Sequence, residues 1–355
     1  MTTEERAKSL ATAAAGYPEL CPPSAVEMME ALRLEFGDER MLDEFRPYAG
    51  GLTRAVAPAT ILHIVSGNTP HAALQTMLRG LLLGSHNLVK FPARGLGDLE
   101  RYGERLPRQL ADKLECAREI QPEWKERADA WVVFGDDETV ETLRRECPAG
   151  RIFDGHGQRV SYAVVFEDAT FESCTGVARD VSLFEQQGCM SPHVVYVGGD
   201  ARAYAQCLAR EMEAFHTAHP APKLPLATRA ALAQKRDAFE FEALSNSGVQ
   251  LWKGSGWTVV FEENPVFRLS PLDRFVFVKP LPEDLGAAVF GIRAITGGIG
   301  VFPATPDHAA GLSQLGASRI CEIGQMQKTP FSWHSESRRN LADLVQWVDY
   351  EGGAC

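Results

Sequence analysis

The sequence has 355 residues, 45% of them hydrophobic and 23% charged, and its formal net charge at pH 7 is -11. This length can bury a sizeable core and allows two domains or one large α/β unit, with the composition of an ordinary globular protein. The negative charge argues against a general nucleic-acid-binding protein, so any anionic ligand must meet a local positive patch.

Targeting and metal signals are missing from the sequence. The first six residues include two acidic side chains and no apolar segment, and no run of 18 apolar residues occurs. We therefore expect a cytoplasmic protein without a secretion signal or a membrane span. The eight cysteines form no Cys-X-X-Cys pair and have no histidine at zinc-ligand spacing, so reduced thiols and no bound metal are expected.

The first part of the chain is predicted to be helical. Apolar residues recur near helical spacing over residues 1–57, which we interpret as an N-terminal cap or oligomer arm. A strand and a tight turn come next. Apolar residues at helical spacing then predict a helix that begins near Pro70 and ends at Gly84. Asn68 or Thr69 fits the cap of this helix.

Strands and helices alternate through the rest of the chain. Apolar or β-branched runs predict strands at residues 60–65, 87–91, 131–135, 151–153, 161–166, 193–197, 257–261, 274–278 and 297–302. Helices are expected within about 99–119 and over roughly 200–245. One further helix is expected to begin at 136, and another is expected to end at 184. The alternation is typical of a doubly wound sheet, and it restarts near 168–170, which predicts two α/β lobes.

One cysteine stands out by its position. Cys189 lies at the exit of a predicted helix and just before a strongly apolar strand, and Gly188 lets other groups approach its sulfur. A thiolate that backbone N–H groups stabilise can act as a nucleophile. The alternative is a buried structural cysteine, which is the commoner role of a thiol.

Two further candidates lie at strand ends. Asn68, at a helix N-terminus, can donate hydrogen bonds to an oxyanion or serve as a simple cap. Lys90 is at the end of an apolar strand, where open α/β sheets usually bind ligands. It is either a ligand-binding lysine or a solvated lysine at a strand end. The chain has no GxGxxG, phosphate-binding lysine loop, HExxH or GxSxG motif, and the glycines at 155 and 157 alone indicate only a turn.

Three landmarks occur in the order found in the aldehyde dehydrogenase superfamily, which the chain resembles. Residues 67–70 read Gly-Asn-Thr-Pro, residues 84–92 contain the strand that ends in Lys90, and residues 187–189 read Gln-Gly-Cys. Within that superfamily the chain is more similar to the fatty-acyl-CoA reductase family that includes the bacterial bioluminescence reductase. The closer match rests on motifs at residues 62–70, 155–161, 187–192, 316–321, 324–326 and 333–334.

The resemblance implies a role for each matching residue. Cys189 is the expected nucleophile, and Asn68 with the Cys189 backbone N–H is the expected oxyanion hole. Lys90 is expected to hold the adenosine ribose of NADPH or NADH. The residues expected along the cofactor are Gly155, His156 and Gly157. The candidate substrate or active-site residues are Ser66, Gln187, Gly188 and His334.

The fold that the resemblance implies is α/β and aldehyde dehydrogenase-like. A Rossmann-like cofactor domain over residues 58–168 precedes a second α/β catalytic domain with the cysteine loop over 169–332, and the tail 333–355 returns near the active site. The implied partners are an acyl-CoA or acyl-carrier substrate, a second copy of the chain in a homodimer and an acyl-transferring protein.

The chain departs from the pattern in two places. Hydrolytic aldehyde dehydrogenases have a Glu-Leu-Gly-Gly segment whose acid activates water, whereas residues 161–166 contain no acid. This absence suits a reductase, because a thioacyl enzyme must wait for hydride without being hydrolysed. The family's tail usually reads His-Asp-Gly-Arg, whereas residues 334–338 read His-Ser-Glu-Ser-Arg.

The predicted function is NADPH-dependent reduction of an acyl thioester to an aldehyde through a thioacyl-Cys189 intermediate. One alternative is CoA-independent oxidation of an aldehyde with NAD(P). A transferase or hydrolase that forms the same thioacyl cysteine without a nicotinamide is a second alternative, and a non-catalytic scaffold is a third.

Overall fold

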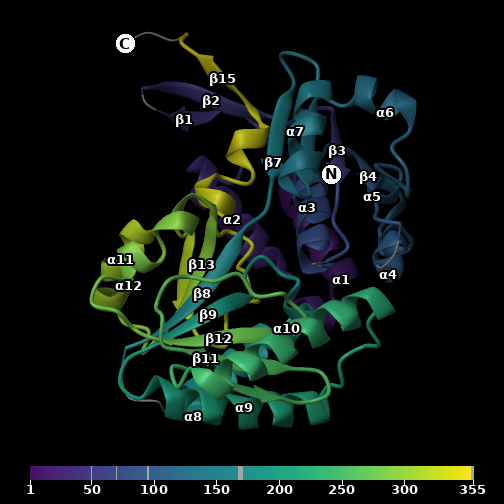
Figure 1. Ribbon diagram of the computed structural model, residues 1–355. Helices are drawn as coiled ribbons and strands as arrows, with labels where there is room; N and C mark the ends of the chain where they lie inside the picture. The colour runs from purple at the N-terminus through teal and green to yellow at the C-terminus, as the bar shows by residue number, and fades with distance from the viewer. Residues whose placement is uncertain (49, 69, 94–95, 167–170, 353–355) are drawn as a thin grey trace. The chain divides into compact units, whose positions relative to one another are not determined.

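The computed structural model describes residues 1–48, 50–68, 70–93, 96–166 and 171–352 (Figure 1). Contacts divide the chain into two compact units, Met1–Gln158 with Pro330–Cys355 and Arg159–Thr329. The boundary predicted near 168–170 falls largely outside the described residues. The units change earlier, because strand β8 (Val160–Val165) is hydrogen bonded to strands of the second unit.

The first unit is built on a five-stranded parallel sheet. Its order is β5-β4-β3-β6-β7, with each neighbouring pair parallel. The strands are β3 (Thr60–Ile64), β4 (His86–Lys90), β5 (Leu114–Ala117), β6 (Ala130–Phe134) and β7 (Ile152–His156). Both faces of the sheet are buried, which explains the near-continuous apolar runs in the sequence.

Helices cover both faces of this sheet. Helices α1 (Thr3–Ala14), α2 (Ala25–Phe36) and α3 (Pro70–Leu83) form one core with residues such as Ile61 and Val89. Helices α6 (Pro122–Arg127) and α7 (Asp137–Glu146) form the other core with Leu62 and Leu88. Alternate residues of one strand therefore enter opposite cores, as the pleat requires. The expected doubly wound design is confirmed for this sheet.

Two predictions in this unit are wrong in detail. Residues 1–57 are not helical throughout, because β1 (Arg46–Tyr48) and β2 (Gly51–Val56) join β15 (Gln346–Tyr350) in an antiparallel sheet. The helix predicted within 99–119 is instead a series of short pieces. These are α4 (Gly97–Glu100), η2 (Tyr102–Arg105), α5 (Arg108–Ala111) and the edge strand β5. Short pieces of this kind leave too few residues for a periodic pattern.

The second unit contains a seven-stranded sheet. Its order is β10-β11-β12-β9-β8-β13-β14, and only the β10–β11 pair is antiparallel. Besides β8, the strands are β9 (Pro192–Val197), β10 (Val249–Lys253), β11 (Thr258–Glu262), β12 (Phe275–Pro280), β13 (Thr296–Phe302) and β14 (Arg319–Glu322). Central strands such as β9 are buried at every position.

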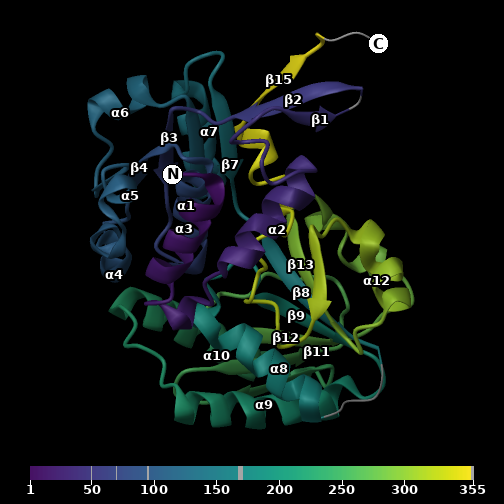
Figure 2. The same ribbon diagram turned by 180° about the vertical axis from the view of Figure 1, so that it is seen from behind.

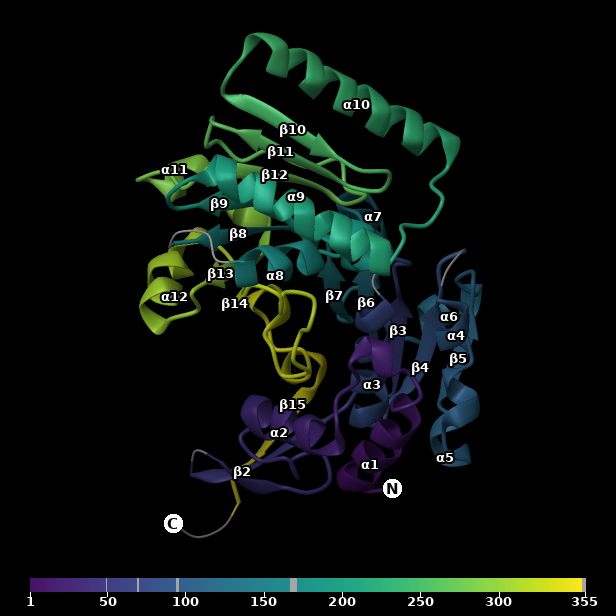
Figure 3. The ribbon, with the colours of Figure 1, turned by 90° about the horizontal axis from the view of Figure 1, so that it is seen from below.

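Helices again cover both faces of the second sheet. Helices α8 (Phe171–Ser182) and α9 (Ala201–Ala218) pack on one face (Figure 2). The long helix α10 (Leu226–Ser245) lies on the other face, where α11 (Leu285–Ala288) and α12 (Pro306–Leu312) also pack (Figure 3). Among the described residues, no helix is both long and apolar enough to cross a membrane.

Candidate active site

The predicted residues of the first unit share one edge of its parallel sheet. Ile64 at the end of β3 is in register with Lys90 of β4 and with Val133 of β6, and Phe134 is in register with His156 of β7. Chain order reverses between β3 and β6 in this sheet, and open α/β sheets bind ligands at the carboxyl ends of strands at such a point. We call this edge, where β3, β4, β6 and β7 end, the carboxyl edge.

Ser66 and Asn68 follow β3 at the carboxyl edge. Ser66 is half-buried, whereas the Asn68 side chain is exposed and precedes the first residue of α3 by two positions. Pro70 begins this helix, and Gly84 follows its last residue with φ of +88°, so both predicted ends of the helix are confirmed. Thr69, the other predicted cap, lies outside the described residues.

Charge is unevenly distributed along the carboxyl edge. Lys90 is the half-buried last residue of β4 and brings a positive charge beside the turn that precedes α3. Helix α7 begins instead with three acidic residues, Asp136 at its cap followed by Asp137 and Glu138. Negative side chains there repel a phosphate. Positive charge at this edge thus lies at the end of β4, and negative charge lies at the start of α7.

Neighbouring side chains restrict the space at Gly155, in β7, and at Gly157, which follows that strand. A Cβ atom on Gly155 would lie 2.7 Å from both Phe153 and Val140 side-chain carbons. A Cβ atom on Gly157 would lie 2.3 Å from Oδ1 of Asp137, which accepts the Gln158 N–H at 2.8 Å. Packing against Val140 and Phe153 explains Gly155, whereas Gly157 meets only an exposed carboxylate that can move, and the contact of either glycine with a cofactor stays a prediction.

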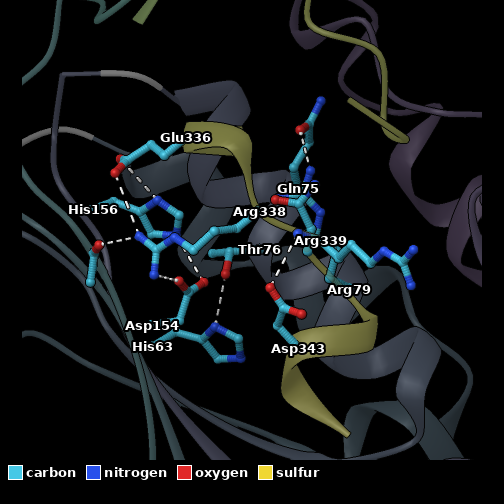
Figure 4. A network of polar contacts seen from close by, with 12 residues as sticks. His63, Gln75, Thr76, Arg79, Asp154, His156, Glu336, Arg338, Arg339 and Asp343 are labelled. Atoms are coloured by element: carbon cyan, nitrogen blue, oxygen red, sulfur yellow. Dashed lines mark hydrogen bonds and ion pairs between the residues drawn. The ribbon is translucent and has the colours of Figure 1, made fainter. Parts of the chain in front are cut away.

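His156 lies in a buried network rather than on an open surface (Figure 4). Its Nε2 is 2.9 Å from Asp154 Oδ2, and its Nδ1 is 3.1 Å from Glu336 Oε1. Burial opposes the imidazolium, but hydrogen bonds to these two carboxylates outweigh it and raise the pKa of His156. The ring also stacks on Phe134 with centroids 4.4 Å apart. Two of these partners, Asp154 and Glu336, were not singled out in the sequence.

Cys189 lies in a loop of the second unit that is fixed through its backbone. The thiol residue is exposed, and its carbonyl oxygen accepts a hydrogen bond from Ser161 Oγ at 2.7 Å. Ser161 Oγ in turn accepts the Gly298 N–H at 2.9 Å. The neighbouring Met190 is buried. The strand β8, which carries Ser161, and the strand β13, which begins at Thr296, therefore hold this loop in place.

The buried thiols are less suited to nucleophilic attack. Burial raises the pKa of Cys321 to about 11, and it raises the pKa of the fully buried Cys174 still further. None of the seven cysteines in the described ranges is part of a disulfide. The exposure of Cys189 at a fixed loop favours the predicted nucleophile over the structural alternative.

Two turns of left-handed backbone meet just before the cysteine loop. Phe184, Glu185 and Gln186 have φ of +54°, +54° and +62°, and residues 272–274 have φ of +68°, +55° and +61°. The Asp273 N–H donates to the Glu185 carbonyl at 3.1 Å, and Arg274 binds the Glu185 carboxylate at 2.8 Å. Such backbone is costly for residues other than glycine, so surrounding contacts must impose it.

Gln186 joins these paired turns to the sheet, and sequence reasoning missed it. Its Nε2 donates to the carbonyls of Pro192 and Phe275, each at 2.9 Å, and its Oε1 accepts the Phe275 N–H at 2.8 Å. The side chain is buried and connects the starts of β9 and β12. A glutamine next to the Gln-Gly-Cys motif was the only signal in the sequence.

The other predicted loop residues also have defined positions. Gln187 Nε2 is 3.4 Å from Asp273 Oδ1, and Gly188 is buried with its carbonyl accepting the Ser191 N–H at 2.9 Å. Burial raises the pKa of Asp273. Ser191 Oγ also accepts a hydrogen bond from the buried Gln327, at 2.9 Å.

The structure thus brings the predicted residues together in two groups. Ser66, Asn68, Lys90 and residues 155–157 share the carboxyl edge of the first unit, and Gln187, Gly188 and Cys189 share a loop of the second. His334 is exposed and lies in the tail, two residues before Glu336. In the part of the chain described, no cluster of three or more His, Cys, Asp or Glu side chains could hold a metal ion.

Known proteins resemble the chain in sequence and in fold. A family model described as acyl-CoA reductase (LuxC) matches residues 4–347. The chain is 22% identical over 352 residues to the long-chain acyl-protein thioester reductase of Vibrio harveyi. This match covers 94% of this chain and 72% of the relative.

Similar solved structures include an NAD-dependent benzaldehyde dehydrogenase from Corynebacterium glutamicum, with TM-score 0.65, 14% identity and coverage of 99% of this chain and 86% of the other. Another is a succinic semialdehyde dehydrogenase from Streptococcus pyogenes in complex with NADP+, with TM-score 0.65, 12% identity and coverage of 99% and 90%. These likenesses confirm the aldehyde dehydrogenase-like fold. The match over most of its length shows that the chain belongs to the acyl-CoA reductase (LuxC) family.

Proposed function

We propose that this protein reduces an acyl thioester to an aldehyde, with Cys189 as the acyl acceptor and a nicotinamide dinucleotide as the reductant. The family match over residues 4–347 carries this proposal. The names of the relatives, long-chain acyl-protein thioester reductases, support an acyl thioester as the substrate. The exposed thiol on a fixed loop supplies a suitable nucleophile.

The first half of the reaction transfers the acyl group to the enzyme. The Cys189 thiolate attacks the thioester carbonyl, and the carbon–sulfur bond to the carrier breaks, so that the carrier leaves as a thiolate that takes up a proton. The Asn68 amide and the Cys189 backbone N–H are the proposed donors to the oxyanion of the tetrahedral intermediate. A bound NADPH or NADH supplies the hydride that converts the Cys189 thioester to the aldehyde.

The strand beside the cysteine loop supports reduction over hydrolysis. Each residue of β8 (Val160–Val165) is buried, and none of the six is an acid. Ser161 in this strand binds the Cys189 carbonyl, so the strand lies directly against the loop. A thioacyl group at Cys189 therefore meets no carboxylate base from β8 that could activate water. This argues against the hydrolase and against oxidation of an aldehyde to an acid.

Several finer features remain proposals. Lys90 is proposed to hold the adenosine ribose, with Gly155, His156 and Gly157 along the cofactor, and NADPH is the preferred reductant. The homodimer, the acyl-transferring partner and the cytoplasmic location are predicted from the sequence alone. Ser66 and His334 are candidate substrate contacts.

A panel of acyl-CoA esters with NADPH and with NADH tests the function, with cofactor oxidation and aldehyde both measured. We expect acyl-dependent oxidation that Cys189→Ala abolishes and that Cys21→Ala, a change at another exposed cysteine, leaves intact. Full activity of the Cys189→Ala protein would exclude the proposed intermediate. Thioester loss without cofactor oxidation would identify a hydrolase instead.

A further inference from the structure

The tail segment, residues 334–338, contacts the end of β7 in the first unit (Figure 4). Arg338 Nη1 is 2.8 Å from Asp154 Oδ1, and its Nη2 donates to the Gly155 carbonyl at 2.8 Å. Glu336 binds His156 at 3.1 Å and lies 3.5 Å from Arg338. These contacts join the tail segment to the last residues of β7.

The geometry at His156 favours a charged ring. Both ring nitrogens lie within hydrogen-bond distance of carboxyl oxygens, and ionised carboxylates only accept. When both carboxyls are ionised, both nitrogens donate, as in the imidazolium, and the pKa of His156 is raised accordingly. His156 and Arg338 then balance Asp154 and Glu336, two positive charges against two negative ones. Arg79 of α3 adds positive potential at Asp154, whose pKa is lowered despite its burial.

Strained backbone brings the tail segment onto β7. Glu336 and Ser337 have φ of +53° and +64°, a conformation that is unfavourable for residues other than glycine. The ionic contacts of Glu336 and Arg338 flank this turn in the chain and can impose it. On the other side, Gln158, which follows two residues after the end of β7, donates its N–H to Asp137 of α7. The 154–157 segment, which is the last three residues of β7 and the residue after them, is therefore held between α7 and the tail segment.

We infer that Glu336 and Arg338 are positioning residues that hold the 154–157 segment in the conformation that receives the cofactor. The inference rests on the proposed function, in which this segment lines the dinucleotide. Arg338 acts on the backbone of the segment directly, through the Gly155 carbonyl, and Glu336 acts through the His156 ring. The tail thus belongs to the cofactor site through the 154–157 segment rather than by contact with the cofactor.

The test compares Glu336→Gln and Arg338→Met with a matched loss of charge next to them, Arg339→Met. Arg339 is exposed and its guanidinium binds the Glu35 carbonyl on α2 instead of β7. NADPH binding is measured by fluorescence. Acylation of Cys189 is measured by the release of CoA in the absence of cofactor, and the order of residues 154–158 is measured by amide hydrogen exchange.

We expect NADPH to bind about tenfold more weakly to the two test variants, because each loses a charge-assisted hydrogen bond. Amide hydrogens should exchange faster only in residues 154–158. CoA release and the Arg339→Met protein should be unchanged, and Arg338→Lys should restore part of the affinity. If Arg338→Met fails to fold, Glu336→Gln and Arg338→Lys give the same comparison. Unchanged affinity in folded variants would overturn the inference. If the unaltered protein binds neither NADPH nor NADH, the proposed function falls and the inference falls with it.

Discussion

Replacing Gln186 by leucine should destabilise the second unit and disturb the cysteine loop. The two side chains are similar in size, but leucine can make none of the three hydrogen bonds to Pro192 and Phe275. Because Phe275 is fully buried, its N–H and carbonyl would find no water to replace the lost partner. An orphaned buried polar group costs about 1–3 kcal/mol, so we expect a loss of about 3 kcal/mol in the free energy of unfolding.

Urea unfolding and the rate of Cys189 alkylation by iodoacetamide measure this effect. Gln186 precedes Cys189 by three residues, so a relaxed turn should change the alkylation rate as well as the urea midpoint. Gln314→Leu is the control, because Gln314 is exposed and its replacement should change stability by under about 0.5 kcal/mol. A Gln186→Leu protein within about 1 kcal/mol of the original, with the original alkylation rate, would refute the reasoning.

Three further predictions concern the first unit. Asn68→Ala should lower turnover of acyl-CoA about 10²-fold through loss of an oxyanion donor, and unchanged turnover would leave Asn68 as a turn residue only. Gly80→Ala should cost about 1–3 kcal/mol in urea unfolding, because its Cβ would lie 1.9 Å from Asn87 Oδ1, whereas Gly311→Ala in α12 has open space and should not destabilise. Burial lowers the pKa of His63 to about 4, against an opposing hydrogen bond to Asn87 Oδ1, so the unfolded chain takes up the proton first. Stability should therefore fall by about 3 kcal/mol as pH drops from about 6.5 to about 4, and a His63→Gln protein with the same pH profile would contradict this.

The sequence allowed much of the central architecture to be predicted. Strong apolar runs located strands such as β3, β6 and β9, since parallel strands buried on both faces carry long hydrophobic stretches. The turn before Pro70 and the end of the helix at Gly84 were also readable, because proline and glycine restrict or permit particular backbone conformations. Edge strands such as β5 and β15 were missed, since half-exposed or exposed residues leave no apolar pattern.

The site was predictable where a residue carries its own chemistry and not where its role depends on a partner far along the chain. Cys189, Asn68 and Lys90 stood out by type and by position at strand ends. Glu336 contacts a residue 180 positions away, and Gln186 contacts one 89 positions away. No local spacing encodes such pairs, and only the folded chain reveals them. Gly155 shows the reverse case, because its packing against Val140 and Phe153 accounts for the glycine without a cofactor.

The first unit is assembled from two separated stretches of chain, and this has a consequence for how the protein is made. Residues 1–158 emerge from the ribosome first, but β15 and the residues that bind Glu35 and His156 emerge only after the whole second unit. Until then the Glu35 carboxylate lacks the three backbone N–H groups of residues 340–342 that it later binds. The first unit is thus completed only after the second has been synthesised, so a released chain truncated before residue 330 should hold a folded second unit and an unfinished first one.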